Sequence, residues 1–117
     1  MSYDLAIWQG DNPSSDREAA KEHDRLYEEY LEVDELMPVT DVIADFLEAL
    51  TERWPDRGVG EETPWAAIPL SEGASGPYVY ISLAWGSAEE TSAYVAQVAS
   101  RLGLVCFDPQ LRSMRTS

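Results

Sequence analysis

The side chains that most often carry catalysis are few and isolated in this sequence. His23 is the single histidine, and it falls on the apolar face of a predicted helix with no second ligand at i+4. A zinc site needs three or four ligands at suitable spacing. Cys106 is the single cysteine and lies within an apolar run, where a free thiol usually behaves as a small hydrophobe. We therefore expect no catalytic residue, no metal and no cofactor.

Three further patterns resemble functional motifs but lack essential members. Ser87 stands three residues before Glu90, which is the spacing of a helix capping box rather than of a nucleophile elbow. The Gly-Ala-Ser-Gly run at 73–76 has no Walker lysine and precedes a strand. The acid pairs at 28–29, 34–35 and 61–62 do not follow the spacing of a calcium-binding loop. They predict solvated helix faces and loops.

One constellation remains a candidate ligand site. If the strands that end near Trp85 and Phe107 are parallel neighbours, Ser87 and Asp108 lie at the same carboxyl edge, beside a helix N-terminus. Trp8 joins them if the first strand runs in the same direction. The alternative is that these residues only complete caps and strand ends.

The charge of the chain is strongly asymmetric. The net charge is −14, and residues 16–62 carry 16 acidic and five basic side chains. A field of this sign repels nucleic acids and anionic membranes, so we expect neither as a partner, and it accelerates encounter with a basic protein. The alternative is that the acidity serves solubility alone.

The periodicity of hydrophobic residues predicts an α+β domain. Segments 3–8, 78–85 and 104–107 have the alternation or short apolar run of strands, and 16–32, 40–54 and 88–102 have helical spacing. Residues 65–70 contain two flanking prolines and predict an irregular or edge strand, residues 71–77 a loop, and residues 111–117 a frayed tail.

These elements predict a three- or four-stranded mixed sheet packed by three helices. The C-terminal part should form a strand-helix-strand unit with parallel strands. The two strands are either adjacent or separated by the first strand of the chain. The two consecutive amphipathic helices imply a shared sheet face. At 117 residues the chain fits a single domain, 1–117. Without a signal-like or long apolar segment, we expect the cytoplasm.

Three stretches of the sequence resemble a known group of proteins. Tyr3–Trp8 (YDLAIW), Ser75–Ser82 (SGPYVYIS) and Gly103–Gln110 (GLVCFDPQ) are similar to segments of small, acidic, uncharacterised bacterial proteins of a type common in actinomycetes. Some proteins of this type are similar to immunity proteins, which protect a cell from a secreted polymorphic toxin. The resemblance implies a protein-binding function and identifies no catalytic residue.

The first functional hypothesis is a non-enzymatic immunity protein. It would bind a cognate toxin, such as a basic nuclease, or another basic protein through the acidic helix and its exit, with an aromatic anchor. The candidate contact residues are Tyr27, Glu28, Glu29, Tyr30, Glu32, Asp34 and Glu35. The alternatives are a small-ligand-binding or enzymatic domain that uses Trp8, Trp85, Ser87 and Asp108, and a homodimeric structural or regulatory protein.

Overall fold

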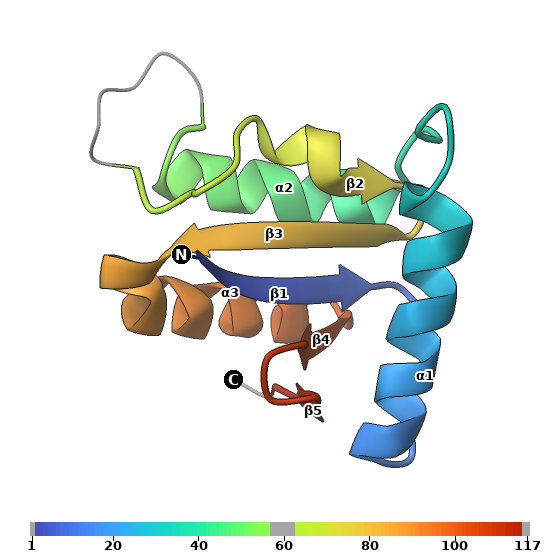
Figure 1. The fold of residues 1–117 in the computed structure, drawn as a ribbon. Helices are drawn as coiled ribbons and strands as arrows, with labels where there is room; N and C mark the ends of the chain where they lie inside the picture. Colours follow the sequence, from blue (N-terminus) through green and yellow to red (C-terminus); the bar gives the residue numbers. More distant parts are fainter. Residues whose placement is uncertain (1, 57–62, 116–117) are drawn as a thin grey trace.

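A computed structural model describes residues 2–56 and 63–115. The sheet consists of β1 (Ser2–Trp8), β2 (Ala74–Ser75), β3 (Tyr78–Ala84), β4 (Val105–Asp108) and β5 (Ser113–Met114). The α-helices are α1 (Asp16–Leu26), α2 (Asp41–Arg53) and α3 (Ala88–Arg101). A π-helical turn, η1 (Tyr27–Leu31), continues α1, and two 3₁₀ turns, η2 (Leu70–Gly73) and η3 (Trp85–Ser87), precede β2 and α3. The α+β class and the three helices are therefore confirmed (Figure 1).

The sheet has five strands in the order β2-β3-β1-β4-β5, and every neighbouring pair is antiparallel. The expectation of three or four strands in a mixed sheet is wrong in both respects. The two additional strands are only two residues long, so neither has a periodicity that sequence inspection detects. The parallel pair is absent because β1 lies between β3 and β4. It runs in the opposite direction to both strands, so each of them pairs with β1 in an antiparallel manner.

The segment β3-α3-β4 has the predicted order of strand, helix and strand. Both strands are antiparallel to β1, so they point in the same direction but do not touch. Of the two arrangements left open by the sequence, the one with the first strand in the middle is observed. Helix α3 crosses behind β1 to make this connection (Figure 1).

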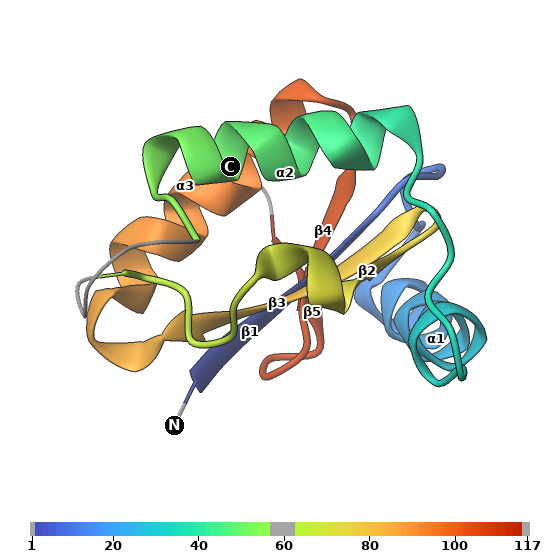
Figure 2. The same ribbon diagram turned by 90° about the horizontal axis from the view of Figure 1, so that it is seen from above.

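The helices cover opposite faces of the sheet (Figure 2). Helices α2 and α3 pack over Leu5, Ile7, Val79 and Ile81 in the larger core cluster. Helix α1 packs in a second cluster on the other face, together with Ala6, Trp8, Tyr78, Val105 and Phe107. The expectation that the first two helices share a face is wrong. Amphipathic spacing shows that a helix has a buried side but does not specify which layer it joins.

The two edges of the sheet also differ from expectation. Within 65–70 only Trp65 makes a bridge, to Leu83, while the supposed loop at 71–77 contains η2 and β2. Within the supposed tail, β5 pairs with β4, and the Arg115 amide donates to the carbonyl of Cys106 at 2.8 Å. Residues 116–117 and the acid pair at 61–62 lie outside the described residues.

The turn between β2 and β3 holds the exit of α1 in place. The Met37 amide donates to Ser75 Oγ at 2.9 Å, and the Thr40 amide donates to the Gly76 carbonyl at 3.0 Å. Gly76 has a φ of +57°, and a Cβ there would lie 3.0 Å from the ring of Tyr30. The close contact with Gly76 fixes η1 against the sheet, so the acidic residues of η1 have a defined position.

Candidate functional site

The candidate site is the surface around η1, where α1 leaves the sheet. Helix α1 starts as its sequence predicts, because the Glu18 amide donates to the side chain of Ser15 at 3.1 Å. Its last turn widens into the π-helical turn η1, a feature that often occurs at functional sites. The predicted contact residues Tyr27, Glu28, Glu29, Glu32, Asp34 and Glu35 are all exposed here. Tyr30 is half-buried against Gly76, so its ring serves the fold rather than an exposed contact.

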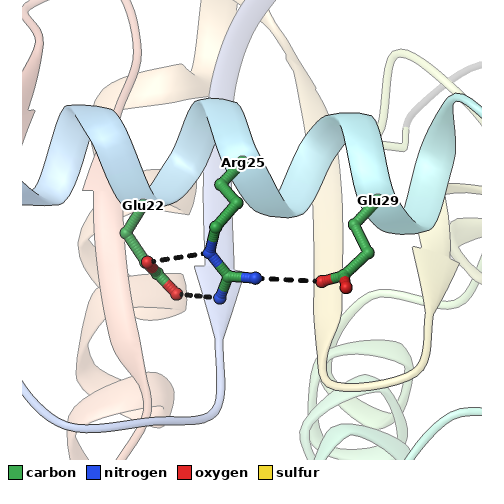
Figure 3. A network of polar contacts seen from close by, with 3 residues as sticks. All are labelled: Glu22, Arg25 and Glu29. Atoms are coloured by element: carbon green, nitrogen blue, oxygen red, sulfur yellow. Dashed lines mark hydrogen bonds and ion pairs between the residues drawn. The ribbon is translucent and has the colours of Figure 1, made fainter.

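The acidic side chains of α1 and η1 fall into two groups. On one side Arg25 binds Glu22, with Nη2 2.5 Å from Oε1, and Glu29, with Nη1 3.0 Å from Oε2 (Figure 3). These contacts follow the i,i+3 and i,i+4 spacings of a helix surface. The charge of Glu29 is therefore compensated within the helix. Glu28 and Glu32 form no ion pair with any residue in 2–56 and 63–115.

Glu28 and Glu32 line a hollow of about 420 Å³, which we call the acidic hollow. Its other lining residues are His23, Asp24, Tyr27 and Tyr80. Oδ2 of Asp24 is 3.2 Å from Nη2 of Arg112. One of the three carboxylates that line the hollow therefore already has a cationic neighbour. The acidic hollow therefore combines two uncompensated carboxylates with two tyrosine rings.

A second depression, the apolar groove, shares Tyr27 and Tyr80 with the acidic hollow. Its volume is about 200 Å³, and its walls come from Tyr27, Leu31 and the segment 67–73. Residues 80–82 of β3 line it as well. The Tyr27 and Tyr80 rings meet edge to face, with centroids 5.6 Å apart. Tyr27 and Ile68 are 37% and 48% exposed, so two large apolar side chains border this groove at the surface.

Beneath both depressions lies an aromatic cluster around His23. The imidazole is 7% exposed, and its Nδ1 is 2.9 Å from the Tyr78 hydroxyl. It contacts the rings of Trp8, Tyr80 and Phe107. Burial lowers the pKa of His23 from its ordinary value, and burial raises the pKa of Tyr78. Both side chains are therefore neutral at pH 7, as the sequence-based interpretation of His23 as a core residue requires.

This environment predicts a pH dependence of stability. The folded state disfavours protonated His23, whereas the unfolded chain protonates it near its ordinary pKa of about 6.5. Stability should be constant above that pH and should fall as the pH drops below it, by at most about 1.4 kcal/mol per pH unit from this one group. Urea unfolding between pH 7 and pH 5 should show a smaller loss in His23→Phe than in the wild type. Equal losses would contradict the assignment.

The alternative ligand constellation is not assembled as predicted. The β1–β3 register pairs Trp8 with Tyr78 and Ser2 with Ala84, so Trp8 and Trp85 lie at opposite ends of β1. Trp8 is 1% exposed and belongs to the aromatic cluster. Its predicted place beside Trp85 is wrong, because antiparallel neighbours end at opposite edges of a sheet.

The remaining members of that constellation lie near Tyr3. Asp108 is buried and accepts hydrogen bonds from the Tyr3 hydroxyl, from Gln110 Nε2 at 2.8 Å and from the Leu111 amide at 3.0 Å. Trp85 is exposed, 6.0 Å from Tyr3 between ring centroids, and borders a hollow of about 350 Å³. Ser87 is exposed and makes no capping bond through its side chain, contrary to the predicted capping box. The carboxylate of Asp108 is thus occupied by its own turn.

Comparison with known protein families, with characterised proteins and with solved structures finds no match. The description of the site consequently depends on its own geometry. Over residues 2–56 and 63–115, no three or more His, Cys, Asp or Glu side chains are grouped to hold a metal ion. No helix in the part of the chain that the structure describes is long and apolar enough to span a membrane.

Sequence inspection missed several residues of the site, among them one acidic, one aliphatic and one aromatic residue. Asp24, Ile68 and Tyr80 come from α1, the segment before η2 and β3, and join only in the folded protein. The hydrophobic alternation of β3 placed Tyr80 on its mixed face, which was a usable signal. Ile68 gave none, because it stands in an interrupted segment between Pro64 and Pro69.

Proposed function

We propose that this protein binds and neutralises a basic partner protein, in the manner of an immunity protein that inhibits a toxin. The observation that carries the proposal is an exposed aromatic ring at Tyr27 beside the carboxylates of Glu28 and Glu32, which form no ion pair within residues 2–56 and 63–115. Interfaces often use such an aromatic anchor, and charges around it steer the partner and exclude wrong ones. The resemblance to small acidic bacterial proteins supports the same class of function.

The reactive side chains favour binding over catalysis. Burial raises the pKa of the Cys106 thiol to about 12, so the thiolate needed for nucleophilic attack does not form at neutral pH. The Nδ1 of His23 is engaged by Tyr78 inside the aromatic cluster. Burial and the hydrogen bond to Asp4 keep the Tyr80 hydroxyl protonated, because both raise its pKa. The thiol, the imidazole and this hydroxyl therefore support the fold, and the exposed side chains of the surface are the ones that would contact a partner.

The charge distribution determines which partner is expected. The excess of acidic residues lies in 16–62, and α1, η1 and α2 belong to this segment. A basic protein should therefore associate rapidly at low ionic strength, and its association rate should fall as salt screens the field. A cytosol-acting toxin such as a basic nuclease fits this description.

Reversing the two uncompensated charges should weaken partner binding about 100-fold. The variant Glu28→Lys/Glu32→Lys replaces attraction with repulsion at the centre of the site, and close charge pairs across interfaces couple strongly. The partner would be recovered from the source cells by affinity capture, and its binding measured by calorimetry at several salt concentrations. If the partner is toxic, co-expression of the wild-type protein with it should restore the growth of the cells.

A matched control is available on α2. Glu48 and Glu52 are exposed and have the same i,i+4 spacing as Glu28 and Glu32, so Glu48→Lys/Glu52→Lys changes the net charge equally. This control should reduce affinity less than about five-fold through the general field alone. Equal losses in both variants, or an acidic partner, would contradict the proposed function.

A further inference from the structure

Two depressions on this surface share two tyrosines. Tyr27 and Tyr80 line both the acidic hollow and the apolar groove, so the Tyr27 ring stands between them. We propose that the partner inserts two side chains from one segment, a basic one into the acidic hollow and an apolar one into the apolar groove, with Tyr27 between them. This inference rests on the proposed function and specifies what the partner must present.

The acidic hollow suits a lysine or arginine side chain. Glu28 and Glu32 supply two carboxylates without an ion-pair partner among residues 2–56 and 63–115, and Asp24 adds a third that Arg112 partly compensates. The tyrosine rings can also contribute, because a cation is attracted to the face of an aromatic ring when it lies within about 6 Å of the ring centroid. Glu29 is not among the lining residues of the hollow, and its carboxylate is already bound by Arg25 (Figure 3).

The apolar groove suits an aliphatic or aromatic side chain. Leu31, Ile68, Pro69 and Leu70 line it, and Glu72 also belongs to its lining. Ile68 remains 48% exposed, so an incoming apolar side chain would remove apolar surface of both molecules from water. A volume of about 200 Å³ is sufficient for one side chain and too small for a helix.

The walls shared by both depressions are held before any partner binds. The Tyr80 hydroxyl donates to Asp4 Oδ2 at 2.7 Å, and its ring packs edge to face with Tyr27. Tyr27 also packs against the His23 ring, at 6.1 Å between centroids. A preorganised anchor loses little conformational entropy on binding, which favours affinity.

Charge complementarity selects among the occupants of this surface. A second copy of this chain would bring the same carboxylates together, because a two-fold interface places one patch against itself. With a net charge of −14 on each copy, that contact is repulsive. A basic segment of a different protein carries the complementary charge, so we assign the surface to it.

Four capped tripeptides test the two-part site directly. In an extended segment, side chains two residues apart point the same way and are separated by about 7 Å. The probes are therefore Lys-Gly-Leu, Lys-Gly-Ser, Ser-Gly-Leu and Glu-Gly-Leu. Titration into the ¹⁵N-labelled full-length protein should shift the amide signals of Glu28 and Glu32 together with those of Ile68 and Ser82. Lys-Gly-Leu should bind at least about five-fold more tightly than the other three peptides.

Variants assign each half of the effect. Glu28→Lys/Glu32→Lys should abolish the advantage of lysine, and Ile68→Ser should abolish the advantage of leucine. The control Glu48→Lys/Glu52→Lys should keep both advantages. Equal affinities for Lys-Gly-Leu and Lys-Gly-Ser, or signal changes confined to other surfaces, would overturn the inference.

Failure of this inference is distinguishable from failure of the proposed function. A partner that loses affinity in Glu28→Lys/Glu32→Lys but binds Ile68→Ser as tightly as the wild type overturns the two-part site and leaves the function in place. A partner that binds both variants unchanged overturns both. A partner weakened at least about five-fold by each variant supports both.

Discussion

Replacing Trp8 with alanine is expected to destabilise the protein by about 4 kcal/mol, because a large buried aromatic side chain leaves a cavity that its neighbours fill only in part. Trp8 is 1% exposed and packs against Tyr78 and Phe107, at 6.3 Å and 6.0 Å between ring centroids. It also stacks near His23, the centre of the aromatic cluster beneath the site. Urea unfolding monitored by circular dichroism gives the free energy of unfolding.

Trp85→Ala is the matched control for that measurement. Trp85 is 57% exposed, so its removal should change the free energy of unfolding by less than about 1 kcal/mol. Similar losses in the two variants would contradict the placement of Trp8 in the core. The sequence made both Trp8 and Trp85 candidates for ligand binding. Comparing the two variants separates their roles, since of these two tryptophans only Trp85 is accessible to a ligand.

Replacing Gly73 with alanine should cost about 3 kcal/mol of stability, since a packed structure tolerates an inserted methyl group poorly. A Cβ at Gly73 would lie 2.3 Å from the carbonyl oxygen of Tyr80, closer than any real contact. The obstacle is backbone of β3, which pairs with β1 at Ala6, so it cannot rotate away as a side chain would. The same change should displace the wall of the apolar groove, which Gly73 lines.

Gly86→Ala supplies the control for this second prediction. A Cβ at Gly86 meets no atom within 4 Å, and the residue is exposed in η3. Its replacement should leave the free energy of unfolding within about 0.5 kcal/mol of the wild type. Chemical denaturation of both variants, with the Ser-Gly-Leu titration repeated on Gly73→Ala, measures stability and groove geometry together. A Gly73→Ala protein as stable as Gly86→Ala would show that the loop does not approach β3 as described.

These two residues matter for function because they lie under or beside the proposed docking surface. Trp8 supports His23, and His23 packs against Tyr27. Gly73 permits the close approach of η2 to β3, which forms one wall of the apolar groove. A destabilising variant at either position would therefore lose partner binding indirectly, whereas the charge reversal at Glu28 and Glu32 acts on an exposed surface and should leave stability nearly unchanged.

Long segments with a clear periodicity were predictable from the sequence. The three helices at 16–32, 40–54 and 88–102 correspond to α1 with η1, to α2 and to α3, within one or two residues at the ends. The strands at 3–8, 78–85 and 104–107 correspond to β1, β3 and β4 to the same accuracy. In each case the local pattern of apolar residues contains the necessary information. The exposure of the acidic residues at the exit of α1 followed from the same pattern.

What required the tertiary structure was the pairing of distant segments. Strands β2 and β5 are too short to carry a pattern and exist because β3 and β4 offer them hydrogen-bonding edges. The position of β1 between β3 and β4 separated Trp8 from Trp85, which no local signal shows. Hydrophobic periodicity also does not say which side of a sheet a helix covers, so α1 and α2 were assigned to one face.

The side chains that could suggest catalysis, and the acidic residues, show the same difference between local sequence information and tertiary arrangement. Residue types and their spacing were enough to establish that His23 and Cys106 are single, lie among apolar residues and lack partners at motif spacing. They also determined where the acidic charge is concentrated, because charge is counted directly from residue types. The folded arrangement was needed to show that Glu28 and Glu32 border a hollow while Glu29 is held by Arg25, and that Ile68 and Tyr80 meet at Tyr27. The physical reason is that a surface depression is formed by side chains far apart in the chain, whose proximity depends on strand order and register.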